Sequence, residues 1–86
     1  MQGLLRDLLA ECVKAMVMQP DDVSVREEYG EDTITYYISV AADDRGRVVG
    51  KQGAVIQGLR AIVKAANRTE HKMSVRVVGK DVLLRT

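Results

Sequence analysis

Apolar residues recur at three- and four-residue intervals near the start of the chain, with charged residues between them. The pattern predicts an amphipathic helix with a wide apolar stripe. The stripe consists of Leu4, Leu5, Leu8, Leu9, Cys12, Val13 and Met16. Pro20 biases Gln19 away from helical angles, so we expect the helix to end near Met18. Cys12 falls on the apolar face, where a buried core thiol is expected.

Strict alternation of apolar and polar residues marks three later segments, 23–26, 33–40 and 73–77, as strands. The second is the clearest. Its side chains divide into an apolar set, Ile34, Tyr36, Ile38 and Val40, and an opposite set, Thr33, Thr35, Tyr37 and Ser39. Residues 29–32, Tyr-Gly-Glu-Asp, predict a hairpin turn between the first two strands.

Helical spacing returns on both sides of the run Val48-Val49-Gly50-Lys51-Gln52-Gly53. We expect a short helix before the run, capped by Asp43 or Asp44, and a longer one from Gly53 to near Asn67. The residues that should cover the sheet from the longer helix are Val55, Leu59, Ile62 and Ala66. The order α-β-β-α-α-β predicts an α+β domain, with a three-stranded sheet packed on helices.

Two glycines three residues apart interrupt this helical pattern, and each costs a helix interior about 1 kcal/mol relative to alanine. The interruption exposes backbone without a Cβ, which another chain can approach closely. A helix that restarts at Gly53 points its positive dipole end at the approaching group, which favours an anion. Lys51 adds a charge and Gln52 an amide. Taken alone, the run is also compatible with a helix–helix turn with a glycine C-cap.

The charge of the chain is divided between its halves. Residues 1–44 carry three basic and ten acidic side chains, a net charge of −7, whereas residues 45–86 carry ten basic and two acidic ones, a net charge of +8. The glycine run lies at the front of the basic half. This asymmetry favours a surface that binds a polyanion, opposite a solvated acidic surface.

Several functional classes find no support in the sequence. A single cysteine excludes an internal disulfide, and no apolar run approaches the ~20 residues of a membrane span, so we expect a cytoplasmic protein. His71 stands beside Lys72 and is expected at the surface. Residues 46–51 fall one residue short of a P-loop, and Gln52 replaces its Ser or Thr. We therefore expect no catalytic residues, no metal site and no cofactor.

The run Val48-Val49-Gly50-Lys51-Gln52-Gly53, with Ile56 three residues on, resembles the signature of KH domains. The element order is similar to the type II, prokaryotic arrangement. More narrowly, the segments 19–23, 44–53 and 59–66 resemble the small single-KH RNA-binding proteins of bacteria, the KhpA family. The resemblance covers about residues 4–78 and implies one domain, 1–79, followed by a tail, 80–86. Ala54 departs from it, since relatives usually carry a basic residue there.

The resemblance implies that the chain clamps about four nucleotides of single-stranded RNA. Gly50 and Gly53 would admit the phosphates, and Lys51 and Gln52 would touch them. The implied rim and groove consist of Arg47 and Arg60, then Val49, Ile56 and part of the second strand. With three tyrosines and no Phe or Trp, stacking platforms of the RRM or OB type are not expected. The family also implies an RNA chaperone or post-transcriptional regulator, acting as a homodimer or with a larger KH-containing RNA-binding protein.

Two further hypotheses concern protein contacts. Val63 lies beside the stripe expected to cover the sheet, so a dimer interface at Val63 is a candidate. The alternative to RNA binding is a KH-fold module used only for protein contact, through the helix after Gly53 or through Val82-Leu83-Leu84 in the tail.

Overall fold

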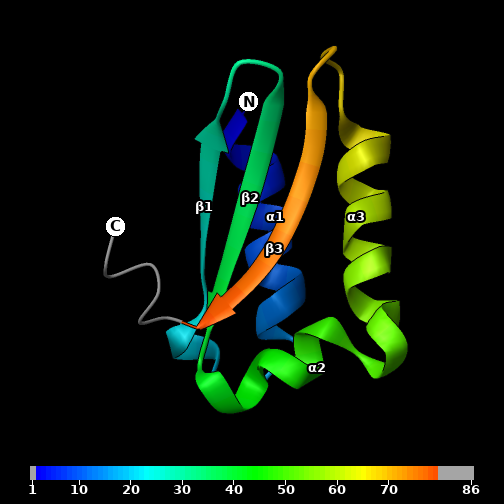
Figure 1. The fold of residues 1–86 in the computed structure, drawn as a ribbon. Coiled ribbons are helices and arrows are strands. Elements are labelled where there is room, and N and C mark those ends of the chain that lie inside the picture. Colours follow the sequence, from blue (N-terminus) through cyan, green and yellow to red (C-terminus); the bar gives the residue numbers. More distant parts are fainter. Residues whose placement is uncertain (1, 80–86) are drawn as a thin grey trace.

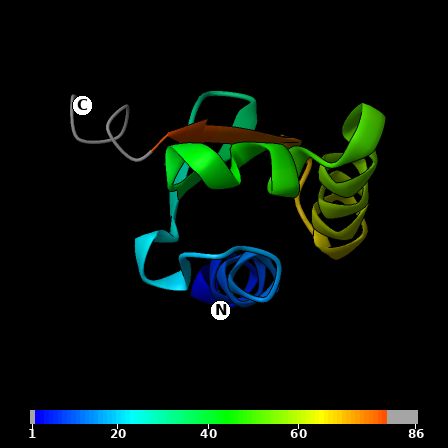
Figure 2. The same ribbon diagram turned by 90° about the horizontal axis from the view of Figure 1, so that it is seen from below.

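The computed structural model describes residues 2–79, in which three helices lie on one side of a three-stranded sheet (Figures 1 and 2). The helices are α1 (Gln2–Lys14), α2 (Arg45–Val49) and α3 (Ala54–Ala66), and the strands are β1 (Ser24–Tyr29), β2 (Thr33–Val40) and β3 (Lys72–Gly79). The predicted order α-β-β-α-α-β is confirmed. The tail 80–86, with its candidate contact Val82-Leu83-Leu84, lies outside the described residues.

The sheet has the order β1-β2-β3, so β2 is the central strand. β1 pairs with β2 in antiparallel fashion through the hairpin, whereas β3 pairs with β2 in parallel, with Tyr36 opposite Val75. Parallel neighbours require a crossover connection. That crossover consists of α2, the glycine run and α3, and it returns along the face of the sheet that α1 also covers (Figure 2).

The two faces of β2 differ as the alternation predicts. The four apolar side chains of the strand, Ile34, Tyr36, Ile38 and Val40, are buried with at most 6% of their surface exposed. Their opposite neighbours lie on the face without helices, where the Arg26 guanidinium carbon is 5.3 Å from the centre of the Tyr37 ring. Cys12 packs against the apolar core but is only partly buried, whereas a buried thiol was expected. The two-layer architecture therefore follows from the sequence pattern.

The buried stripe of α3 differs from the predicted one. Ile56, Leu59 and Val63 face the core, whereas Ile62 is exposed. Val63 has no exposed surface, so the predicted dimer contact at this residue is wrong. Two neighbouring apolar stripes run along α3, and the sequence alone does not say which one is turned inward. In the folded domain, the stripe of Ile56, Leu59 and Val63 is the one turned toward the core.

Helix α1 ends at Lys14 and not near Met18 as predicted. Beyond its end, a residue far along the chain holds the backbone. The carboxylate of Asp44 is 1% exposed and accepts hydrogen bonds from the backbone N–H groups of Met18 and Gln19, each at 3.1 Å. Those donors are therefore held out of the helix. Asp44 occupies the N-cap position of α2, but its side chain forms no capping hydrogen bond there, contrary to expectation.

Candidate nucleic-acid interface

The predicted break between two helices is confirmed at the glycine run. α2 ends at Val49, α3 begins at Ala54, and a single turn over Lys51–Gly53 joins them. Gly50 adopts φ 79° and ψ 171°, a backbone conformation that is essentially restricted to glycine. Gln52 and Gly53 have φ of 57° and 78°, in the left-handed region. Three of the four residues from Gly50 to Gly53 thus have positive φ, which exposes the backbone at a sharp corner.

The two glycines of the run have different roles. A Cβ on Gly50 would lie 2.5 Å from Cγ2 and 2.7 Å from the backbone N of Val55. The run therefore folds back onto the first turn of α3 at a distance that only glycine allows. A Cβ on Gly53 would meet no atom closer than 3.9 Å. Gly50 fixes the shape of the corner, and Gly53 leaves a free backbone surface beside it.

The tip of the run carries Lys51 and Gln52, both exposed. Lys51 forms no ion pair with any of the residues 2–79, so its ammonium group is available to an external anion. The N–H groups of Gly53 and Ala54 donate to the carbonyl oxygens of Gly50 and Lys51. The turn itself therefore uses two of the donors at the start of α3, so the attraction for an anion rests mainly on Lys51 and the helix dipole.

The two arginines predicted at the rim are exposed, and each already has a partner. Arg47 Nε lies 3.3 Å from Oδ1 of Asp44. This is the buried carboxylate that also accepts a hydrogen bond from the backbone N–H of Met18. Arg60 Nη2 donates to the carbonyl oxygen of Val75 at 3.3 Å. Because β3 is an edge strand, this bond ties the middle of α3 to the open edge of the sheet.

Of the predicted apolar groove, Val49 is half-buried and Ile56 is 8% exposed. Ile56 therefore belongs mainly to the core and offers only an edge to a ligand. The assignment of part of the second strand to this groove is wrong. β2 is flanked on both sides by other strands, and its apolar side chains are covered by the helices. The strand that lies beside α3 is β3 (Figure 1).

A basic pocket between α3 and β3 was missed by the sequence analysis. Arg60, Lys64, Asn67, His71, Lys72 and Met73 line it. Lys64 lies four residues after Arg60, which places both on one face of α3 and could have indicated a continuous basic surface. His71, expected at the surface, is half-buried, and its Nδ1 is shielded from solvent without a hydrogen-bond partner among residues 2–79.

The charge at the two edges of the sheet differs. The basic pocket lies beside β3, at one edge of the sheet, whereas the carboxylates of β1 at the opposite edge, Glu27 and Glu28, lie near Arg6 and Arg26. Between residues 2 and 79, no three His, Cys, Asp or Glu side chains are grouped in a way that could hold a metal ion. In the same segment, none of the helices has the length and apolar character that crossing a membrane requires.

Comparisons with known proteins agree on one family. The model of the KhpA/KhpB KH domain matches residues 6–78. The RNA-binding protein KhpA of Clostridium perfringens is 38% identical over 71 residues, which are 83% of this chain and 95% of that protein. KhpA of Chlamydia caviae is 35% identical over 75 residues, 86% of this chain and 96% of that protein.

A solved structure gives the same result for the fold. The crystal structure of Era in complex with MgGDPNP and nucleotides 1506-1542 of 16S ribosomal RNA aligns with a TM-score of 0.58. The alignment covers 88% of this chain at 16% identity, and this chain spans 31% of the length of that one. At this identity the likeness concerns the fold alone, and it supports the type II KH arrangement.

Proposed function

Because the chain belongs to the KhpA/KhpB family of KH-domain proteins, we propose that it binds single-stranded RNA by clamping the phosphate backbone at Gly50-Lys51-Gln52-Gly53. The family consists of RNA-binding proteins and not of enzymes, so no catalytic step is assigned. The observation that carries the proposal is the exposed tip, Lys51 and Gln52, held between two glycines of positive φ.

The proposed clamp depends on open backbone at Gly53 and on the positive charge of Lys51. At Gly53 the absence of a Cβ leaves open backbone, so a phosphate group can come close to the start of α3. The ammonium group of Lys51 provides the opposing charge. From there the backbone of the RNA runs along α3 past Arg60 and reaches the basic pocket, where Lys64 and Lys72 lie. A KH domain holds about four nucleotides in this way.

Base contacts are apolar in this proposal. Val49 and the exposed edge of Ile56 lie next to the glycine run and offer methyl groups to the bases. None of the three tyrosines lies on α2, the run or α3, so no aromatic ring is placed to stack on a base there. Sequence preference should therefore be weak, and affinity should depend strongly on phosphate contacts.

A footprint of about four nucleotides gives one clamp little affinity. Two clamps joined in one assembly raise the apparent affinity through effective concentration, without any new contact to the RNA. We therefore include in the proposal that the chain pairs with a second copy or with a larger KH-containing RNA-binding protein. Such an assembly would act in the cytoplasm as an RNA chaperone or a post-transcriptional regulator.

The test is titration of a short single-stranded RNA against wild type and Lys51→Asp/Gln52→Asp. The double variant should bind at least about tenfold more weakly, because it replaces a charge-assisted contact by repulsion. Asp is well tolerated at the left-handed angles of Gln52, so the fold should remain intact, as circular dichroism can verify. For wild type we expect the slope of log K against log salt to lie between about −0.7 and −1.4, corresponding to one or two neutralised phosphates.

The matched control is Lys14→Asp/Ala15→Asp, at the last residue of α1 and the residue after it, both exposed. It makes the same change in net charge, so it separates a local effect from a global one. RNA binding that is equally weak in both variants would contradict the clamp. Wild type that fails to bind RNA at all would instead favour a KH-fold module used only for protein contact.

A further inference from the structure

The sheet has a second face, opposite the helices, which the proposed clamp does not use (Figure 1). Because the apolar side chains of each strand fill the core, alternation turns the residues between them toward this open face. On β2 these include Thr33, Thr35 and Tyr37, which are half-buried and all carry a hydroxyl group. Ser74 of β3 adds another hydroxyl directly beside Thr35. The open face is therefore polar and rich in hydrogen-bonding groups.

A row of three side chains crosses the middle of the open face. The strand register places Arg26 of β1 opposite Tyr37 of β2, and Tyr37 opposite Arg76 of β3. Neighbouring strands lie about 4.8 Å apart, so the row spans about 10 Å. The guanidinium carbon of Arg26 is 5.3 Å from the centre of the Tyr37 ring, which is a cation–π distance. Two guanidinium groups thus flank one aromatic ring.

The two arginines of the row differ in their surroundings. Arg26 Nη2 donates to Oε2 of Glu28 at 3.2 Å, and its side chain is still 42% exposed. An ion pair this exposed is weak, so it leaves the guanidinium group able to contact a ligand. Arg76 is exposed and forms no ion pair with any of the residues 2–79. Arg76 therefore offers the stronger contact for an anion.

The charge of the open face favours a polyanion. Its charged side chains on the three strands are Arg26, Lys72 and Arg76 against Glu28 alone, a net charge of +2. Arginine, serine, threonine and tyrosine side chains are the groups that contact phosphate and sugar oxygens in nucleic-acid complexes. Aromatic rings and guanidinium planes also stack on unpaired bases. The open face combines both kinds of group, which fits a single-stranded RNA.

The open face is continuous with the basic surface of α3. Lys72 lines the basic pocket between α3 and β3, and it is also the first outward residue of β3. Lys72 and Arg76 are four residues apart on the strand, which is about 13 Å. Because β3 is an edge strand, a chain that leaves the pocket meets no further strand before it reaches the open face.

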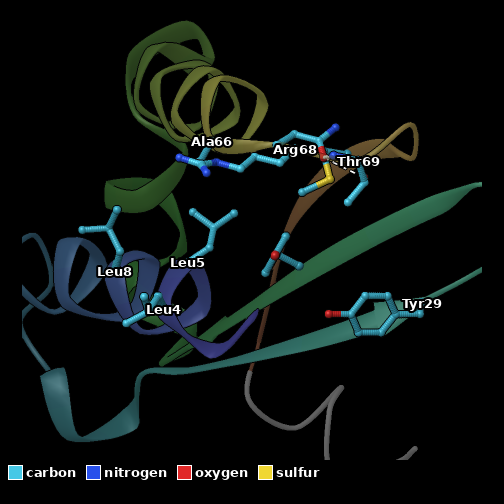
Figure 3. Close-up of a pocket in the computed structure, with 10 residues that line it drawn as sticks. Leu4, Leu5, Leu8, Tyr29, Ala66, Arg68 and Thr69 are labelled. Atoms are coloured by element: carbon cyan, nitrogen blue, oxygen red, sulfur yellow. Dashed lines mark hydrogen bonds between the residues drawn. The ribbon is translucent and has the colours of Figure 1, made fainter. Parts of the chain in front are cut away.

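The other hollow of the domain does not offer such a route. It is an apolar groove of about 490 Å³ between α1 and the end of α3 (Figure 3). Leu4, Leu5 and Leu8 line it from α1, and Arg68 is the one charged side chain among its described lining residues. A phosphate chain finds little complementary charge there. The charges therefore direct an RNA from the pocket toward β3 and not toward α1.

We infer that an RNA longer than the footprint of one clamp continues past Lys72, around the edge of β3, and is held on the open face by Arg26, Tyr37 and Arg76. Arg76 contacts a phosphate group, and Tyr37 with the guanidinium group above it provides a surface on which a base stacks. The inference rests on the proposed function, since the clamp determines where the RNA enters. It extends the footprint of a single copy of the chain to the opposite face of the sheet.

The test compares the binding of four-nucleotide and twelve-nucleotide oligouridine by wild type, Arg76→Glu and Lys14→Glu. Arg76→Glu should bind the longer RNA at least about fivefold more weakly than wild type, because an attraction becomes a repulsion. The shorter RNA occupies the clamp alone and should bind both proteins equally. Lys14→Glu makes the same change in net charge at an exposed residue of α1 and should leave both affinities unchanged. Equal binding of the longer RNA by wild type and Arg76→Glu would overturn the inference.

Salt dependence is a second readout, which a purely stabilising role of the row would not alter. The slope of log K against log salt should be steeper for the longer RNA than for the shorter one. Arg76→Thr removes the charge with a residue that suits a strand, and should make the slope for the longer RNA shallower by about 0.7. A slope that Arg76→Thr leaves unchanged would contradict a phosphate contact at this position.

Two further outcomes separate this inference from the proposed function. Binding of the shorter RNA that is indifferent to Lys51→Asp/Gln52→Asp, with binding of the longer RNA still weakened in Arg76→Glu, would refute the clamp alone. A working clamp, with amide chemical shifts of Tyr37 and Arg76 that the longer RNA leaves unchanged, would refute the inference alone. A twelve-residue oligoglutamate that shifts these amides as strongly as the longer RNA would overturn RNA as the occupant of the open face.

Discussion

Helix α3 separates two surfaces of opposite character. On the side of β3, Arg60 and Lys64 line a basic pocket, and on the side of α1, Ala66 borders an apolar groove. The buried stripe Ile56, Leu59 and Val63 runs between them. A surface that depends on exposed charge holds a phosphate chain reversibly and in a salt-dependent way. An apolar surface gains from being covered permanently. The difference indicates that one short helix can serve two kinds of partner.

The largest effect on the free energy of unfolding should come from the buried stripe of α3, because the packing of that stripe holds both surfaces in place. Val63→Ala removes two buried methyl groups and should lower the free energy of unfolding by about 2 kcal/mol. Ile62→Ala, one residue away and exposed, should change it by less than about 0.5 kcal/mol, because alanine also favours the helix. Urea unfolding of both variants measures the difference. Equal losses would mean that the rotation of α3 is not the one described.

A more selective effect is expected at the glycine run, where a substitution should alter RNA binding through the basic surface alone. Gly53→Ala keeps open space around the new Cβ and should cost about 1–2 kcal/mol for its left-handed angle. Gly50→Ala adds a clash with the backbone N of Val55, so it should cost more and weaken RNA binding further. Thermal unfolding and RNA titration of the two variants provide the comparison. Sedimentation should show the same state of association in both, and a change in association would contradict the separation of the two surfaces.

Much of this arrangement could be predicted from local sequence. The alternation of apolar and polar residues in 33–40 predicted both faces of β2, and the paired glycines predicted the break between α2 and α3. The signals are strong because period and turn chemistry are properties of neighbouring residues. The candidate residues Lys51 and Gln52 were placed at an exposed tip for the same reason.

What could not be predicted depends on contacts between distant parts of the chain. The backbone N–H of Met18, beyond the end of α1, is held by Asp44, 26 residues later. Two neighbouring apolar stripes on α3 satisfied the local pattern, and the packed domain buries the one that contains Val63. The strand beside α3 depended on the strand order, which put β3 and not β2 there. In each case several arrangements satisfied the local pattern, and tertiary packing selected one.

The central claim is that RNA is held at the glycine run and on the β3 side of α3, and not on the α1 side. Amide chemical shifts of isotope-labelled protein, followed by NMR during titration with a four-nucleotide single-stranded RNA, test it most directly. The account predicts the largest changes at Gly50–Gly53, smaller ones at Arg60, Lys64 and Lys72, and none at Leu4–Leu8. Changes centred on Leu4–Leu8, with Gly50–Gly53 unaffected, would contradict it.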